Sequence, residues 1–162
     1  MMDNVTDVSR FPLEDQAREA TAKRRIGLGV TGLADALIMC GARYGSAPAV
    51  ELTETWMRAI RDHAYRASAA LAAEKGSFPL FDADEYLSSE TPSKLPADVQ
   101  DAIREHGIRN ALLTSIAPTG TISLFAGNVS SGIEPVFSYY YTRNVLMPDG
   151  TQREEEVSDY AY

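Results

Sequence analysis

A short apolar stretch at residues 112–116 runs into the turn sequence Pro-Thr-Gly-Thr at residues 118–121, and residues 122–125 are apolar again. Proline has a fixed φ and no backbone donor, so it suits a turn or the first position of a helix. This order predicts a strand, a tight turn and a short helix. A chain that alternates strands and helices in this way belongs to the α/β class.

The same turn predicts a binding site for an anion, most naturally a phosphate group. Thr119 and Thr121 offer hydroxyl groups, and Gly120 allows a ligand to approach the backbone closely. The first backbone N–H groups of a helix lack intrahelical partners and converge on one place. An ordinary capped turn stays open as the alternative, because threonine and glycine also build turns that bind nothing.

A second turn-rich segment follows at residues 127–135, with the sequence Gly-Asn-Val-Ser-Ser-Gly-Ile-Glu-Pro. Two polar loops around one short helix are more than a connection needs, so we expect them to form the rim of a ligand site. Glu134 precedes a proline in this rim. A structural hydrogen bond and a ligand contact are both open as its role.

Charge and composition exclude several classes of partner. The net charge of the 162 residues is −8 and no basic tract is present, which argues against nucleic-acid backbones and anionic membranes as partners. No apolar run approaches the roughly 20 residues that span a bilayer, and the first residues lack the pattern of a secretory signal. The single cysteine rules out an internal disulfide, so we expect a cytoplasmic protein.

No catalytic residue and no metal ligand are predicted in this chain. Cys40 lies in an apolar stretch, which favours a buried structural thiol over a nucleophile. His63 and His106 are far from Cys40 and from each other, so a zinc site is not expected.

The remaining pattern predicts the order of elements. Helices are expected at residues 13–23, 33–40, 48–75 and 97–106, strands at residues 112–116 and 136–145, a buried strand or tight turn at residues 26–30, and irregular backbone at residues 1–12 and 76–96. In the longest helix the predicted buried stripe is Val50, Trp56, Ile60, Ala64, Ala67 and Leu71. Residues 139–141 are all tyrosine and would point alternately to the two faces of their strand. This favours a structural role, with core on one face and rim on the other, over a functional cluster.

The glycines at residues 27, 29 and 32 match the spacing of a dinucleotide-binding loop. A hydrophobic strand should precede such a loop, but residues 23–25 are Lys-Arg-Arg, and no acidic residue follows about 20 positions on. Close packing of the backbone is the favoured interpretation, and an NAD-dependent oxidoreductase is the weakest alternative.

Several segments together resemble the large catalytic subunit of ribonucleotide reductase, and most of all its adenosylcobalamin-dependent (class II) enzymes. These segments are residues 24–37, 117–123, 131–135 and 141–143, with residues 145–150 and 155–160 adding to the likeness. The resemblance implies a C-terminal part of a ten-stranded α/β barrel, incomplete in this chain. We expect one fragment made of an opening segment of strand and helix (residues 1–46), a helical segment (47–106) and a phosphate-loop segment (107–162).

The resemblance also implies site residues. In the family, the Pro-Thr-Gly-Thr-like loop holds the diphosphate or triphosphate of the ribonucleotide substrate. Carried over to this chain, the substrate-binding residues are Pro118, Thr119, Gly120, Thr121 and Ile122. The two threonine hydroxyls, together with the N–H groups of Gly120, Thr121 and Ile122, would face phosphate oxygens.

The chain departs from the family in its cysteines. The family's reaction begins with a cysteine thiyl radical, uses two further cysteines as reductant, and places Asn and Glu on an Asn-x-Cys-x-Glu loop. Only Cys40 is present here, in a context that matches none of these motifs. The chain is therefore expected to be inactive alone. Adenosylcobalamin is implied for the parent enzyme, and no cobalamin-binding motif is found here.

The expected partners are the ribonucleotide substrate and the remainder of the reductase barrel. A barrel fragment leaves strand edges and apolar faces uncovered, so self-association is expected where that remainder is missing. The alternative function is a non-catalytic module that binds nucleotide phosphates or assembles with another polypeptide.

Overall fold

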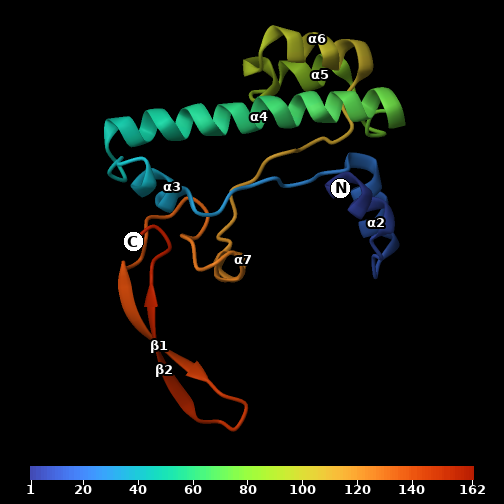
Figure 1. Cartoon of the computed structure of the whole chain (residues 1–162). Coiled ribbons are helices and arrows are strands. Elements are labelled where there is room, and N and C mark those ends of the chain that lie inside the picture. Colours follow the sequence, from blue (N-terminus) through green and yellow to red (C-terminus); the bar gives the residue numbers. More distant parts are fainter. The chain divides into compact units, whose positions relative to one another are not determined.

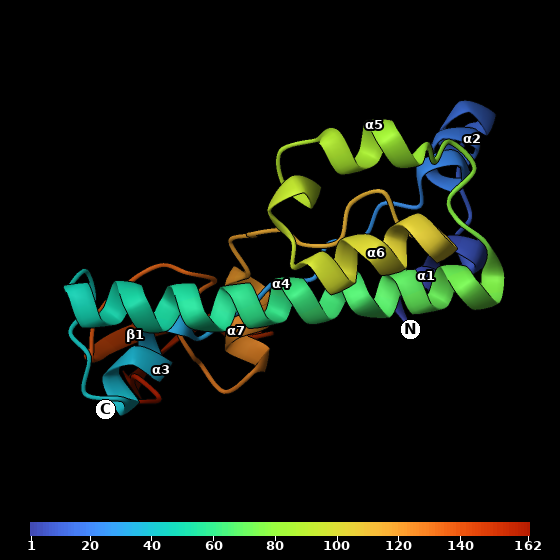
Figure 2. The ribbon, with the colours of Figure 1, turned by 90° about the horizontal axis from the view of Figure 1, so that it is seen from above.

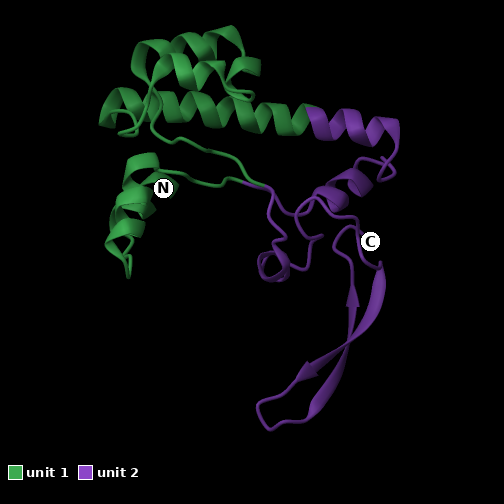
Figure 3. Ribbon diagram, turned by 180° about the vertical axis from the view of Figure 1, so that it is seen from behind, with its two compact units in different colours: residues 1–28, 55–115 green, residues 29–54, 116–162 purple.

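The computed structural model describes residues 1–162. In chain order its elements are α1 (Met2–Val8), α2 (Glu14–Lys23), α3 (Leu33–Met39), α4 (Ala47–Lys75), α5 (Ala83–Ser88), the 3-10 helix η1 (Pro92–Lys94), α6 (Ala97–His106), α7 (Gly120–Phe125), β1 (Tyr140–Leu146) and β2 (Gln152–Ser158) (Figure 1). The chain forms two compact units, each assembled from two stretches of sequence (Figure 3). Unit 1 contains residues 1–28 and 55–115, and unit 2 contains residues 29–54 and 116–162.

All four helices predicted from periodicity are confirmed, with ends within one residue of the predicted ones. They are the elements α2, α3, α4 and α6. No helix is both long enough and apolar enough to cross a membrane.

Unit 1 has an apolar core where α5 and α6 pack against α4 (Figure 2). Its buried residues are Tyr65, Ala69, Phe78, Leu87, Leu95, Val99, Ile103, Ile108 and Leu113. Val99 and Ile103 are four positions apart on α6, so they lie on one face of that helix, and both are fully buried.

The buried face of α4 differs from the predicted stripe. Val50 and Ala67 are exposed, whereas Tyr65, Ser68 and Ala72 are buried. The other four predicted residues, Trp56, Ile60, Ala64 and Leu71, are half-buried, so the stripe is confirmed in part. The most deeply buried positions lie one residue further along, because an alanine-rich helix is apolar on several faces. Ser68 can be buried because its hydroxyl donates to Asn110 Oδ1 at 3.0 Å.

Helix α1 is held in unit 1 by the carboxylate of Asp3, which is 3% exposed. Arg24 Nε and Asn110 Nδ2 donate to Asp3 Oδ1 at 2.8 and 3.1 Å, and Arg109 Nε donates to Oδ2 at 3.2 Å. The prediction of irregular backbone at residues 1–12 is therefore wrong for α1. Isolated short helices are marginal, and the bonds that stabilise this one join residues far apart in sequence.

The segments predicted as strands at residues 26–30 and 112–116 are extended, but they form only a single parallel bridge, Leu28 to Thr114. Leu28 N–H donates to the carbonyl of Leu113 at 2.8 Å, and Ser115 N–H donates to that of Leu28 at 3.0 Å. Leu28 is 40% exposed, so this pair is not buried within the chain. Parallel strands are normally buried between neighbouring strands and covering helices. Here the sheet is not closed, which is consistent with an incomplete barrel.

Residues 76–96 contain α5 and η1, so the prediction of irregular backbone there is wrong for these two elements. Asp82 caps α5, since its Oδ1 accepts from the N–H of Glu85 at 2.9 Å. This Asp-x-x-Glu spacing is a recognisable start of a helix, although the prolines nearby obscure it.

In unit 2, β1 and β2 form an antiparallel hairpin with Tyr141 opposite Val157 and Arg143 opposite Glu155. The turn predicted at residues 147–150 is confirmed by a bond from Gly150 N–H to the carbonyl of Met147 at 2.9 Å. The strand itself begins at Tyr140, four residues later than predicted. Tyr140 is exposed and Tyr141 half-buried, which is the alternation expected along a strand.

Candidate functional site

The predicted phosphate loop lies at the beginning of α7 in unit 2. Thr119 is the residue before the helix and has a φ of 49°, in the left-handed region, and Gly120 is the first helical residue. Pro118, Gly120, Thr121 and Ile122 are exposed, and Thr119 is half-buried. The predicted strand before this turn is extended backbone, and the predicted short helix after it is confirmed.

The N–H groups of Gly120, Thr121 and Ile122 find no acceptor in the chain. The first bond along α7 is that of Ser123 N–H to the carbonyl of Thr119, at 2.7 Å. The side chain of Thr119 makes no cap bond to the helix, so these three N–H groups are not bonded by it either. Free N–H groups at the start of a helix carry partial positive charge and suit an anionic oxygen.

The two threonines of the loop differ in what their hydroxyls do. Thr119 Oγ1 accepts from the N–H of Gly132 at 2.6 Å and donates to Oγ1 of Thr31 at 3.2 Å. Its proton is therefore already used within unit 2. Thr121 is exposed and its hydroxyl has no partner in the chain, which leaves it available to a ligand.

A pocket of about 420 Å³ lies against this loop. Its lining includes Gly120 and Thr121 from α7, Ser131 and Glu134 from the second turn-rich segment, and Tyr141 from β1. The predicted rim is thus brought together on one side of α7. Glu134 is exposed and its carboxylate accepts no hydrogen bond within the chain, so a structural hydrogen bond is not found and a ligand contact stays a prediction.

The lining of this pocket contains no lysine, arginine or histidine, and it contains the carboxylates of Glu134 and Asp159. A phosphate group would therefore be held by neutral N–H and O–H donors. Further positive charge would have to come from outside this pocket.

The glycines near the loop serve different purposes. A Cβ on Gly132 would lie 2.6 Å from the carbonyl oxygen of Ala117, and this residue has a φ of +48°, so both space and backbone require glycine. A Cβ on Gly27 would lie 2.6 Å from Ser115 Oγ, which confirms close packing in the Gly-x-Gly-x-x-Gly segment. By contrast, a Cβ on Gly120 would meet nothing within 4 Å. The fold of this chain therefore does not explain a glycine at that position.

The second turn-rich segment is held to α3 by Asp35, a buried carboxylate that the sequence reasoning missed. Asp35 Oδ2 accepts from the N–H of Ser130 at 3.0 Å, and Oδ1 is buried without a partner. Burial raises the pKa of Asp35, and the nearby carboxylate of Asp159 raises it further, although the bonds from Ser130 act in the opposite direction. An aspartate inside the apolar run of residues 33–40 was the signal that could have revealed it.

Cys40 is exposed, so the prediction of a buried thiol is wrong. It directly follows the last residue of α3 and does not belong to the buried face of that helix, which Leu33 and Leu37 form. His63 Nδ1 lies 2.8 Å from the carbonyl of Ala59 on its own helix, and His106 lies beside Glu105. The chain contains no cluster of three side chains able to hold a metal ion.

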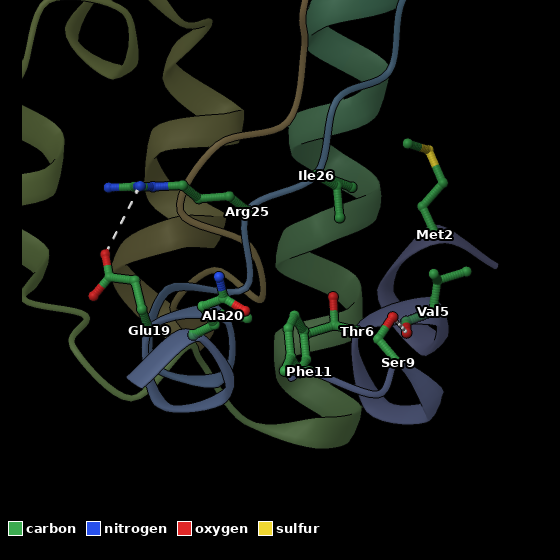
Figure 4. Close-up of a pocket in the computed structure, with 10 residues that line it drawn as sticks. Met2, Val5, Thr6, Ser9, Phe11, Glu19, Ala20, Arg25 and Ile26 are labelled. Atoms are coloured by element: carbon green, nitrogen blue, oxygen red, sulfur yellow. Dashed lines mark hydrogen bonds and ion pairs between the residues drawn. The ribbon is translucent and has the colours of Figure 1, made fainter. Parts of the chain in front are cut away.

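A second pocket, of about 560 Å³, lies in unit 1 and contains none of the predicted site residues (Figure 4). Met2, Val5, Phe11 and Ile26 give it a largely apolar lining. Arg25 lines it together with Glu19, and their side chains are 3.9 Å apart. Nothing in this lining matches the donor arrangement at α7.

A family model described as "Ribonucleotide reductase, barrel domain" matches residues 1–159. The chain therefore belongs to the ribonucleotide reductase family, and the predicted resemblance is confirmed.

Individual relatives agree with this assignment. The vitamin B12-dependent ribonucleoside-diphosphate reductase of Mycobacterium tuberculosis is 43% identical over 145 residues, which cover 90% of this chain and 18% of that protein. The protein of the same name from Thermoplasma acidophilum is 40% identical over 145 residues, covering 90% and 17%. The large subunit of ribonucleoside-diphosphate reductase from Arabidopsis thaliana is 32% identical over 155 residues, covering 90% and 19%. The chain thus spans about a fifth of the length of these relatives.

Proposed function

We propose that this chain is the part of a ribonucleotide reductase barrel that binds the phosphates of the ribonucleotide substrate. The binding residues are Pro118, Thr119, Gly120, Thr121 and Ile122. The substrate is a ribonucleoside diphosphate or triphosphate, and the parent enzyme reduces it to the deoxyribonucleotide by thiyl-radical chemistry. The names of the relatives, which are ribonucleoside-diphosphate reductases, support the diphosphate.

The observation that carries this proposal is the set of free donors beside Gly120. Gly120 and Thr121 line the pocket, their N–H groups and that of the next residue, Ile122, have no acceptor, and the hydroxyl of Thr121 is exposed. Gly120 has open space where a Cβ would stand and no left-handed φ. Close approach of a ligand to the backbone explains the glycine, because neither packing nor conformation does.

The remaining machinery belongs to the rest of the polypeptide. Cys40 is the only thiol, and one thiol cannot close a disulfide to supply two electrons. We therefore propose that the chain is inactive alone and functions with the remainder of a ten-stranded α/β barrel. Within the chain, residues 1–46, 47–106 and 107–162 would be its opening, helical and phosphate-loop segments.

Adenosylcobalamin would serve the parent enzyme as the source of the radical, since relatives from two organisms are named vitamin B12-dependent. No residue of this chain is assigned to that group. The linings of the pockets of about 420 and 560 Å³ contain neither His63 nor His106, and no other side chain in them marks a site for the cobalamin.

Calorimetric titration with a nucleoside diphosphate tests the proposed loop. We expect the unchanged chain to bind measurably, and the double variant Gly120→Val with Thr121→Ala to lose most of this affinity. Thr142→Ala, at a matched exposed threonine on β1, should bind as tightly as the unchanged chain. Unchanged affinity in the double variant would exclude the loop as the site. A turnover assay with ribonucleotide, reductant and adenosylcobalamin should give no product from the chain alone.

The alternative is a stand-alone module that binds nucleotide phosphates or assembles with another polypeptide without taking part in reduction. The chain has a loop of free donors that suits a phosphate, but only one cysteine, Cys40, which is exposed. Binding without reduction is consistent with both features, so this alternative is kept. Mixing the chain with the remaining reductase polypeptide discriminates the two. Restored turnover supports the barrel fragment, and binding without turnover supports the module.

A further inference from the structure

Thr31, from the glycine-rich segment, is joined to the phosphate loop by a relay of hydroxyl groups within unit 2. Thr119 Oγ1 donates to Thr31 Oγ1 at 3.2 Å, and Thr31 Oγ1 donates to the carbonyl of Ser130 at 2.9 Å. Thr119 Oγ1 also accepts from the N–H of Gly132 at 2.6 Å. We propose that Thr31 is a positioning residue for the substrate phosphates, an inference that rests on the proposed function of the loop.

The relay fixes the direction of both hydroxyl groups. Each threonine hydroxyl has one proton to donate. Because Thr31 gives its proton to the carbonyl of Ser130, it presents a lone pair to Thr119. Thr119 then gives its proton to Thr31 and turns its own lone pair toward the N–H of Gly132. Such chains of hydrogen bonds strengthen one another in a partly buried setting.

The relay also keeps Thr119 from capping α7. A threonine before a helix ordinarily bonds an N–H of the first turn, and it does so from an extended backbone conformation. Thr119 instead has a φ of 49°, which is unfavourable for a β-branched residue, and makes no cap bond. Its hydroxyl is held by Thr31 and Gly132. The N–H groups of Thr121 and Ile122 therefore stay available to phosphate oxygens.

Replacing Thr31 should release Thr119 to become an ordinary cap. In Thr31→Val the hydroxyl of Thr119 loses its acceptor, and Thr119 can return to an extended conformation and bond the first turn of α7. The carbonyl of Ser130 stays paired, because the N–H of Gly32 also donates to it, at 2.7 Å. The variant thus removes the relay without leaving that carbonyl unpaired.

Amide hydrogen exchange on the full chain tests the relay without any ligand. In Thr31→Val we expect the Gly132 amide to exchange about fivefold faster, the effect of one lost hydrogen bond, and the Ile122 amide to exchange more slowly. Thr31→Ser should restore both rates. Thr53→Val is the matched control, since Thr53 is also half-buried in unit 2 and its hydroxyl donates to the carbonyl of Ala49 at 2.7 Å.

Thr31→Ala, which removes the same hydroxyl without its bulk, must give the same result as Thr31→Val. Gly132 exchange within twofold of the unchanged chain in both variants would overturn the relay. Equal acceleration in Thr31→Ser and Thr31→Val would overturn it too, since the hydroxyl would then not be the cause.

Titration with inorganic diphosphate separates this inference from the proposed function. We expect Thr31→Val to weaken binding about fivefold, and Thr31→Ser to bind as the unchanged chain does. If the unchanged chain does not bind diphosphate, the proposed function fails and the exchange rates alone decide the relay. If Thr31→Val binds as tightly as the unchanged chain, the loop keeps its function and the positioning role of Thr31 is refuted.

Discussion

The backbone N–H of Ser130 donates to Oδ2 of Asp35 at 3.0 Å, and so joins residues that are 95 positions apart in the sequence. Ser130 belongs to the turn-rich segment that lines the pocket, and Asp35 belongs to α3. The bond holds this part of the rim in place by means of a carboxylate that is 3% exposed. A buried carboxylate has consequences for how stability depends on pH.

Asp35→Asn should stabilise unit 2 at neutral pH. Burial and the nearby Asp159 raise the pKa of Asp35, so the ionised form is disfavoured in the folded state. Folding therefore becomes less favourable as pH rises from the unfolded pKa, near 3.9, through the raised folded pKa. Asparagine keeps an acceptor for Ser130 without the charge. We expect a gain on the order of 1 kcal/mol at pH 7, and less at pH 4.

Urea unfolding followed by the amide signals of Ala34 and Ser130 measures this effect, at pH 4 and at pH 7. The difference between variant and unchanged chain should grow with pH. If the stability gain of Asp35→Asn over the unchanged chain is smaller at pH 7 than at pH 4, the raised pKa of Asp35 is contradicted.

Asp3 should show the opposite dependence on pH. Burial pushes the pKa of Asp3 upward, but the hydrogen bonds from Arg24, Arg109 and Asn110 outweigh it and hold the pKa below its ordinary value. The stability that Asp3 contributes is therefore present above the unfolded pKa, near 3.9, and is lost as pH falls through the lowered folded pKa. Asp3→Asn should destabilise unit 1 by about 3 kcal/mol at pH 7, because the buried guanidinium of Arg24 loses its buried carboxylate and keeps only the half-exposed one of Asp7.

Thermal unfolding of Asp3→Asn, with Asp7→Asn as the control, checks this prediction. Asp7 also accepts from Arg24, at 2.7 Å, but its side chain is 50% exposed, so its replacement should cost much less. Equal losses for the two variants would show that burial of the Asp3 pair does not matter.

Alanine scanning should separate the two kinds of glycine around the loop. Gly132→Ala should cost about 2 kcal/mol, since the Cβ meets the carbonyl of Ala117 and the backbone is left-handed. Gly120→Ala should leave stability unchanged or slightly higher, because it places a helix former in the first turn of α7 without a clash. Unfolding midpoints in urea measure both. A marked loss in Gly120→Ala would show that the fold requires this glycine, and would remove the argument for a ligand there.

The exposed apolar side chains of unit 2 should cause self-association of the isolated chain. Phe125 and Phe137 are each 93% exposed, and Ile116 is 70% exposed. Apolar surface of this kind normally faces another polypeptide. Light scattering should show growth with concentration, and Phe125→Asp with Phe137→Asp should reduce it. Thr142→Asp with Asn144→Asp, at two exposed polar positions of β1 in the same unit, adds the same charge without removing apolar surface and is the control. A monomer at millimolar concentration would contradict the prediction.

The sequence predicted best what local chemistry decides. Periodicity and helix stop signals placed α4 and α6, and Gly107 ends α6 with the positive φ that glycine allows. The start of α7 at Gly120 followed from the turn residues around it. These features depend on neighbours a few positions away.

What the sequence did not reveal depends on distant partners. Helix α1 is held by Asp3 through residues about 100 positions away, and Asp35 and Thr31 act through the loop near Ser130. The predicted strands at residues 26–30 and 112–116 are extended but bridge at one place only. Strand pairing depends on neighbours, and most of the length of the relatives lies outside this chain.

Resonance mapping of the full chain with inorganic diphosphate tests the central claim most directly. If the start of α7 holds the substrate phosphates, the largest shifts should fall on the amides of Gly120, Thr121 and Ile122, with smaller shifts at Ser131. If those amides do not move while diphosphate binds elsewhere, for instance near Arg24 and Arg25, the loop is not the phosphate site and the account is wrong.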